Sequence, residues 1–178
     1  MYAHLLALAV AAAEAAPEDE PSALIVGAEA FGEFFPSSSV PVPGTSQPQQ
    51  SVLTGLRLLF GFRYAARFRG FAVFEGGYAA AGRRAGSGQD GLMLGAGAEG
   101  QWQVNRFLMP MVRLMGDVRV AHWARNMSGT LARSALVFSL GLRVFRFLEL
   151  HACIGSDFAG GTSVGFGAAL GWQWAFDV

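Results

Sequence analysis

The sequence predicts an all-β fold: a closed, antiparallel, up-and-down barrel of eight strands that crosses a membrane. Three observations lead to this prediction. Apolar and polar residues alternate with a period of two along most of the chain. The segments that show this alternation are joined by long and short connections in alternation. Charged residues inside the segments occupy positions of one parity. Side chains of a strand point alternately to its two faces, so one parity corresponds to one face of a sheet.

The charged residues of the predicted strands occupy odd-numbered positions. Acidic and basic side chains are evenly represented there, and charges buried inside a barrel must be paired because an unpaired one is very costly. We therefore expect a charge network in the barrel lumen, with the members Glu29, Glu33, Arg57, Arg63, Arg69, Glu75, Glu99, Arg113, Asp117, Arg119, Arg133, Arg143 and Glu149.

Eight segments carry the alternation of a strand, and none of them has the period of 3.6 that marks an amphipathic helix. They cover residues 24–35, 52–64, 68–80, 91–104, 107–122, 131–144, 147–156 and 163–178. Pro110 interrupts the fifth segment. Because proline cannot donate a ladder hydrogen bond, we expect it near a strand end or at a bulge.

The connections differ in length in a regular way. Very short turns are predicted at residues 65–67, 105–106 and 145–146, and longer loops at 36–51, 81–90, 123–130 and 157–162. The loop at 36–51 contains four prolines and many Ser and Gln residues, so it cannot pair as a strand. It is the best candidate for contact with a partner.

Composition suits one membrane-embedded domain. The 178 residues are 52% hydrophobic and only 15% charged, whereas soluble domains carry about 25% charged residues. The net charge is zero, which gives no reason to expect a nucleic-acid partner. Residues 1–15 have the apolar core and the Ala13-Glu14-Ala15 cleavage site of a secretory signal peptide, and 16–178 then form a single barrel domain.

Two features indicate that the apolar, even-numbered face points outward. The odd-numbered face mixes its charges with bulky apolar residues and glycines, which suits a packed interior better than a water-facing surface. Aromatic residues gather on the even face beside the short turns, as in an interfacial girdle: Phe62, Tyr64, Phe68, Trp102, Trp174 and Phe176. The alternative is a soluble, lipocalin-like barrel with the apolar face inside, which would bind a small ligand.

The carboxyl-terminal pattern Ala169-x-Gly171-x-x-Trp174-x-Phe176 carries a family resemblance. Over about residues 22–178 the chain resembles the small eight-stranded outer-membrane barrels of Gram-negative bacteria, the OmpA-type and OmpX-type group. Gly171, Trp174 and Phe176 resemble the signal that the barrel-assembly machinery reads, although the first position is usually polar and two residues follow Phe176 here.

The resemblance implies a multi-pass protein of the outer membrane with its short turns in the periplasm. Its expected partners are outer-membrane lipid, the barrel-assembly machinery and an extracellular ligand at the loops.

An interior filled by side chains predicts a structural, anchoring or surface-interaction protein rather than a general porin. Two alternatives stay open: a narrow gated channel, and an outer-leaflet lipid-modifying enzyme such as a lipid A deacylase or acyltransferase. His122, Ser128 and His151 would be the residues to test for an enzyme, but the His-x-Ser motif of the deacylases is absent, so no catalytic residue is predicted. No cofactor is expected. The three dispersed histidines and the single Cys153, expected to be a packed small residue, show no metal-ligand spacing.

Overall fold

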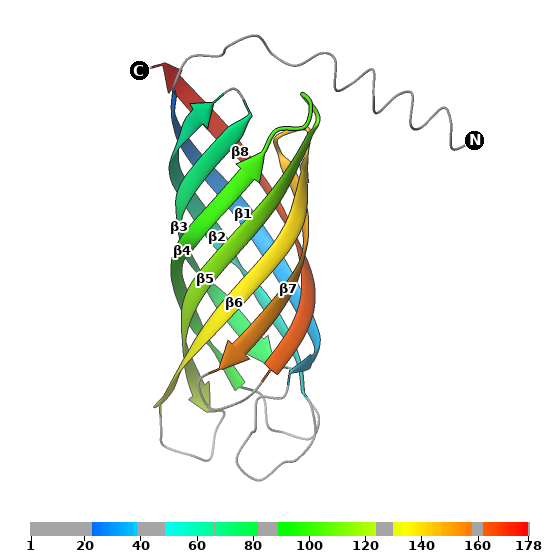
Figure 1. Ribbon diagram of the computed structural model, residues 1–178. Helices are drawn as coiled ribbons and strands as arrows, with labels where there is room; N and C mark the ends of the chain where they lie inside the picture. Colours follow the sequence, from blue (N-terminus) through cyan, green and yellow to red (C-terminus); the bar gives the residue numbers. More distant parts are fainter. Residues whose placement is uncertain are drawn as a thin grey trace, which may run out of the picture.

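The structure, a computed structural model, describes residues 23–38, 49–65, 67–81, 89–123, 130–157 and 162–177. Each strand pairs antiparallel with its neighbours in sequence, and the last strand pairs with the first to close a barrel (Figure 1). The strands are β1 (Ala23–Ser38), β2 (Gln49–Ala65), β3 (Phe68–Ala81), β4 (Gln89–Trp102), β5 (Leu108–Trp123), β6 (Thr130–Val144), β7 (Leu148–Asp157) and β8 (Thr162–Asp177). The predicted eight-stranded, up-and-down, closed barrel is confirmed.

Within the described ranges, no helix is long and apolar enough to cross a membrane.

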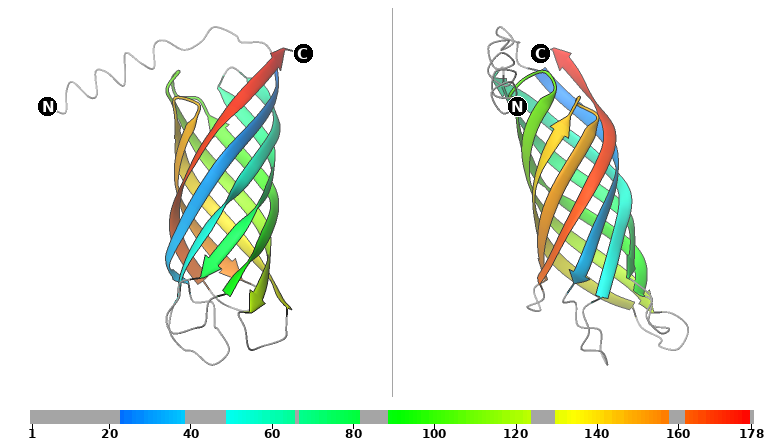
Figure 2. Two further views of the ribbon diagram at one scale, coloured as in Figure 1. Left: turned by 180° about the vertical axis from the view of Figure 1, so that it is seen from behind. Right: turned by 90° about the vertical axis from the view of Figure 1, so that its right-hand side faces the viewer.

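The two ends of the barrel differ. Ala23 at the start of β1 pairs with Asp177 at the end of β8, at the end of the barrel that carries the short turns (top in Figure 1). Figure 2 shows from two further sides that the strands are strongly inclined to the barrel axis. The strand ends that flank the longer connections, such as Ser38 of β1 and Gln49 of β2, lie at the opposite end. Residues 39–48, 82–88, 124–129 and 158–161 lie outside the described residues, as do the predicted signal peptide and Ser128.

The rim of short turns is joined by backbone hydrogen bonds between successive turns. The N–H of Gln103 donates to the carbonyl oxygen of Arg67 at 2.7 Å, and the N–H of Phe145 donates to that of Phe107 at 2.8 Å. The N–H of Gly171 in β8 donates to the carbonyl oxygen of Phe147 at 2.9 Å. These bonds extend the pairing beyond the strands, so that this end of the barrel is held together around its circumference.

The first loop is shorter than predicted. Strand β1 continues past Pro36 to Ser38, which pairs with Gln49 of β2, so the prediction that residues 36–51 are all loop is wrong. The pairing with β2 shifts register between Phe35 and Ser38. The ladder thus accommodates the missing N–H of Pro36 by a local irregularity instead of ending there. Asp90, also predicted in a loop, lies in β4.

The turn between β4 and β5 is longer than predicted. Residues 103–107 leave the ladder, whereas the sequence placed Val104 and Phe107 in strands. The side chain of Asn105 explains the difference, because its Oδ1 accepts hydrogen bonds from the N–H groups of Phe107 at 2.8 Å and Leu108 at 2.9 Å. Such a side-chain acceptor competes with strand pairing.

Pro110 lies near the start of β5, opposite Leu142 of β6, in a register that runs without a shift from Leu108 to His122. The prediction that it lies near a strand end is confirmed, and no bulge is needed.

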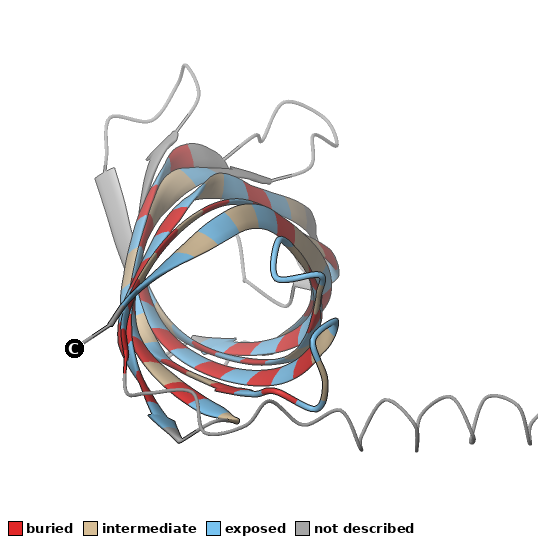
Figure 3. Cartoon of the chain, turned by 90° about the horizontal axis from the view of Figure 1, so that it is seen from above, coloured by how far each residue is buried: buried red, intermediate tan, exposed pale blue. Residues whose placement is uncertain are grey.

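The odd-numbered face points into the barrel. Figure 3 shows buried and exposed residues alternating along the strands. Leu94 and Leu56, on the even face, are 69% and 66% exposed, whereas Leu59 and Val73, on the odd face, are fully buried. The lipocalin-like alternative requires the reverse arrangement and is wrong. The barrel therefore presents an apolar outer surface and encloses a polar interior, the arrangement of a transmembrane β-barrel.

Candidate functional site: a buried charge network in the lumen

Eleven of the thirteen predicted network residues are buried inside the barrel. They are Glu29, Glu33, Arg57, Arg63, Arg69, Glu75, Glu99, Arg113, Asp117, Arg143 and Glu149. The backbones of Arg119 and Arg133 pair with each other between β5 and β6, and their side chains lie outside the described residues. The lumen thus holds many charges out of contact with water, a situation that is stable only if they neutralise one another.

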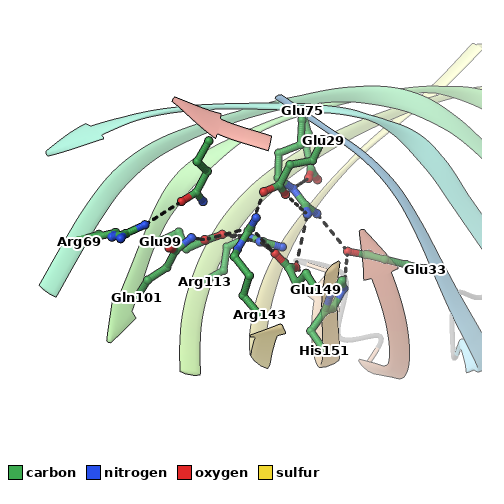
Figure 4. Close-up of polar contacts among 12 residues, drawn as sticks. Glu29, Glu33, Arg69, Glu75, Glu99, Gln101, Arg113, Arg143, Glu149 and His151 are labelled. Carbon is green, nitrogen blue, oxygen red and sulfur yellow. Dashed lines mark hydrogen bonds and ion pairs between the residues drawn. The ribbon is translucent and has the colours of Figure 1, made fainter. Parts of the chain in front are cut away.

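Arg57 of β2 contacts carboxylates from three other strands. Figure 4 labels these carboxylates, Glu29, Glu33, Glu75 and Glu149. Arg57 Nε donates to Glu75 Oε2 at 3.0 Å, and its Nη2 donates to Glu33 Oε1 at 3.4 Å. Its Nη1 lies 3.7 Å from Glu29 Oε2 and 3.6 Å from Glu149 Oε1. The guanidinium also lies 4.5 Å from the centroid of the Phe31 ring, which adds a cation–π contact.

Glu149 of β7 accepts hydrogen bonds from Arg113 and Arg143, the other two arginines of the connected network. Arg113 Nη2 donates to both of its carboxylate oxygens at 2.8 Å, and Arg143 Nη2 donates to Oε2 at 2.8 Å. Arg113 is also paired with Glu99, at 2.5 Å from Nε to Oε2, and Arg143 is paired with Glu29. Ion pairs therefore connect residues of all strands from β1 to β7 across the lumen.

The connected network carries more acids than bases. Five carboxylates (Glu29, Glu33, Glu75, Glu99 and Glu149) share three guanidinium groups (Arg57, Arg113 and Arg143). Among the ion pairs of the described residues, the carboxylates of this set thus outnumber its guanidinium groups by two. A buried excess of this kind favours an additional positive charge nearby, either a proton or a metal ion.

Inward-facing glycines give the charged side chains their space. Gly95 of β4 is in register with both Glu75 and Asp117, and a Cβ there would come within 2.6 Å of Asp117 Oδ1 and 2.8 Å of Glu75 Cγ. Gly171 of β8 stands in the same way opposite Glu29, whose Cγ would lie 2.5 Å from a Cβ. The side chains of Glu75, Asp117 and Glu29 thus occupy space that a Cβ on the neighbouring strand would otherwise fill.

Several polar residues of the lumen were not singled out by the sequence. Gln101 donates to Glu99 Oε1 at 2.6 Å, and Arg69 donates to Gln103 at 2.7 Å and to Gln173 at 3.3 Å. These glutamines have odd numbers. The parity that places the charges in the lumen therefore places these glutamines there as well.

His151 and Cys153 of β7 join the network beside Glu33. His151 Nε2 lies 3.0 Å from Glu33 Oε1, and its Nδ1 lies 2.9 Å from Glu149 Oε1. The potential metal-binding atoms of Glu33, His151 and Cys153 all lie within 4.8 Å of one another, and the three residues are buried. The sequence offered one signal for this cluster, the His151-x-Cys153 pair, which places both side chains on one face of a strand.

The predicted aromatic girdle lies on the outer surface at the short-turn end. Phe62, Tyr64, Phe68, Trp102, Trp174 and Phe176 are all exposed. Phe68 and Trp102 contact each other at 6.4 Å between ring centroids. Phe107, Phe145 and Phe147 of the turns extend the band, with Phe107 and Phe145 at 5.3 Å. Gly171 of the predicted assembly signal faces the lumen, whereas Trp174 and Phe176 face outward.

No protein-family model and no curated protein sequence matches the chain. Solved structures do. The crystal structure of Ail, the attachment invasion locus protein of Yersinia pestis, superimposes with a TM-score of 0.54 at 11% identity, covering 86% of this chain and 97% of Ail. Its complex with the heparin analogue sucrose octasulfate has a TM-score of 0.52 at the same identity and coverage.

The barrel domain of Pseudomonas aeruginosa OprF has a TM-score of 0.48 at 14% identity, covering 87% of this chain and all of that domain. At such identities the likeness to Ail shows the fold alone. The chain has the architecture of the small eight-stranded outer-membrane barrels, of the OmpA and OmpX type, as the sequence predicted.

Proposed function

We propose that the protein is an outer-membrane β-barrel of a Gram-negative bacterium whose lumen is closed by its charge network. In this role the barrel anchors the chain and displays its longer loops at the cell surface, and it is neither an enzyme nor an open pore. The observation that carries the proposal is the set of buried ion pairs joining Arg57, Arg113 and Arg143 to carboxylates on other strands. An eight-stranded barrel leaves just enough space for side chains to fill, and these side chains occupy it.

The outer surface supports an orientation in the membrane. The aromatic band around Trp102 and Phe145 lies at the short-turn end, where an interfacial girdle would meet the periplasmic side of the membrane. The longer connections would then face the outside, and any ligand would be recognised there. Outer-membrane lipid would surround the apolar face, and the assembly machinery would read Gly171, Trp174 and Phe176.

The position of His151 argues against the lipid-modifying alternative. Its ring is buried and lies between the carboxylates of Glu33 and Glu149, inside the lumen. Lipid tails meet the other face of the barrel. A general base for an ester of an outer-leaflet lipid would need to lie within hydrogen-bond reach of that substrate.

The test combines fractionation with conductance. Unboiled protein from a purified outer-membrane fraction should migrate differently on a gel from boiled protein, as a closed barrel does. The purified barrel should then give no reproducible current steps in planar bilayers. A double variant, Arg113→Ala with Glu149→Ala, removes two members of the network and serves as the opened control, provided that it keeps the gel shift. Conductance steps in the unmodified protein would contradict the closed lumen.

A further inference from the structure

Three potential metal ligands from two strands meet in the lumen. Glu33 comes from β1, and His151 and Cys153 come from β7, with β8 between them. Figure 4 shows the Glu33 and His151 side chains pointing toward each other. Their facing atoms are 3.0 Å apart, and the Cys153 Sγ completes a group whose members lie within 4.8 Å of one another. The side chains are almost completely buried.

Strand register brings these residues together. Gly167 of β8 is paired with His151 on one side and with Glu33 on the other, so all three lie in one row. A Cβ at Gly167 would come within 2.6 Å of His151 Nε2 and 2.8 Å of Glu33 Cγ. The glycine therefore opens the space in which the imidazole and the carboxylate meet. Cys153 follows two residues after His151 on the same face of β7 and lies opposite another glycine, Gly165.

From this geometry we infer that Glu33, His151 and Cys153 form a binding site for a divalent transition-metal ion of the Zn²⁺ class. A thiolate, an imidazole and a carboxylate are the ligands that Zn²⁺ takes in proteins, at metal–ligand distances of about 2.0–2.3 Å. Tetrahedral coordination at such distances separates ligand atoms by about 3.4 Å. Glu33 Oε1 and His151 Nε2, at 3.0 Å, would therefore move slightly apart, and any longer separation within the 4.8 Å group would shorten. A water molecule would supply the fourth ligand.

Glu149 provides the outer support that such a site requires. A histidine that ligates a metal usually directs its second ring nitrogen to a carboxylate or carbonyl group, which orients the ring. Here His151 Nδ1 lies 2.9 Å from Glu149 Oε1, which leaves Nε2 facing Glu33 and the space beside Cys153. Glu149 is itself held by Arg113 and Arg143. The Glu149 carboxylate is thus close enough to Nδ1 to orient the imidazole for Nε2 coordination.

The charge balance also favours a cation. Both ring nitrogens of His151 lie within 3.0 Å of a carboxylate oxygen, so the surroundings of the ring favour positive charge. A divalent ion would displace the Nε2 proton and the thiol proton of Cys153. Two positive charges leave and two arrive, so the metal enters without changing the net charge of the buried network. The larger number of carboxylates in the network is therefore compatible with either the two protons or the metal ion.

Cobalt is the probe for the test, because Co²⁺ takes zinc sites and reports on its ligands by absorption. The barrel is refolded into detergent micelles with Co²⁺ present, excess metal is removed, and folding is verified by the mobility of unboiled protein on a gel. We expect about one Co²⁺ per folded chain and a thiolate-to-cobalt charge-transfer band in the near ultraviolet. Added Zn²⁺ should displace the cobalt and abolish the band.

Variants distinguish this site from adventitious binding. Cys153→Ser should remove the charge-transfer band, and Cys153→Ser, His151→Gln and Glu33→Gln should each weaken Co²⁺ binding by at least about tenfold. Glu75→Gln is the matched control, because Glu75 is also a buried carboxylate on Arg57 but is not one of the three ligands. It should keep both the band and the affinity.

Two results would overturn the site. One is a folded, unmodified barrel that retains no stoichiometric Co²⁺, and the other is a Cys153→Ser variant that binds Co²⁺ as tightly as the unmodified chain. Because the gel shift reports the closed barrel separately, loss of metal binding and loss of the fold cannot be confused.

Discussion

At the residue scale, glycines matter to the lumen as much as charges do, and two of them allow a matched comparison. We expect Gly167→Ala to lower the free energy of unfolding by about 1–3 kcal/mol, because its Cβ would overlap His151 and Glu33. Gly32→Ala on the neighbouring β1 is the control. A Cβ there meets nothing within 4 Å, so this change should raise stability by about 0.5–1 kcal/mol through backbone entropy. Urea titrations of the refolded barrel measure both; equal effects would argue against the packing explanation.

The excess of carboxylates makes a second residue-scale prediction. Arg57→Met should cost about 3–5 kcal/mol in the free energy of unfolding, because it leaves four surrounding carboxylates without their shared cation. Glu75→Gln should cost less, because it removes one charge from the side of the network that has too many. The same urea titrations compare the two variants. A larger loss for Glu75→Gln would mean that the network is not acid-rich as described.

At this scale the sequence predicts which face of the sheet a side chain occupies, but it does not predict which other side chains it contacts. Alternation is a local property, so the odd numbers of Arg113 and Glu149 were enough to place both in the lumen. That these two side chains meet depends on the inclination and curvature of the sheet, which let side chains of β5 and β7 meet across β6, the strand between them. The meeting of Glu33 with His151 depends further on the pairing of β1 with β8, the contact most distant in sequence. For this reason the candidate metal ligands looked dispersed.

At the element scale, the turn between β6 and β7 is strained. Phe145 and Arg146 have φ values of 53° and 67°, and the left-handed region costs about 1–2 kcal/mol for a residue other than glycine. We expect Arg146→Gly to raise the free energy of unfolding by about 1 kcal/mol. Arg106→Gly, in the neighbouring turn, is the control, because Arg106 does not have a positive φ. It should lower stability by about 0.5–1 kcal/mol through the entropy of the unfolded chain. Thermal or urea unfolding that ranked the two variants in the opposite order would contradict this explanation.

Strand existence was predictable at this scale, and strand ends less so. A period of two identifies a strand wherever one face is apolar, and each predicted segment corresponds to one observed strand. The ends depend on single side chains. Asn105 withdraws residues 103–107 from the ladder through its own hydrogen bonds, and Pro36 lies within a ladder that shifts register around it. Neither outcome follows from alternation.

At the scale of the whole molecule, the barrel is polar inside and apolar outside, and both faces depend on closure of the sheet. Closure gives every strand two neighbours, which removes the unpaired edges that could not survive in lipid. The same closure gathers charges from seven strands into a space where they can neutralise one another. An open sheet with these faces would expose unpaired backbone to lipid and separate Glu29 from Arg143. The charge network and the closed ladder are therefore two consequences of one topology.

The position of the membrane can be measured with one substitution at each of two heights. Leu114 lies on the outer face near the middle of β5, and Val104 lies in the turn at the short-turn end; both side chains are exposed. In lipid vesicles, Leu114→Arg should cost about 2–4 kcal/mol in the free energy of unfolding, because the charge would lie near the bilayer midplane. Val104→Arg should cost only about 0–1 kcal/mol, because it lies near the interface. In water both positions would tolerate arginine equally, so equal and small costs in vesicles would show that lipid does not surround this face.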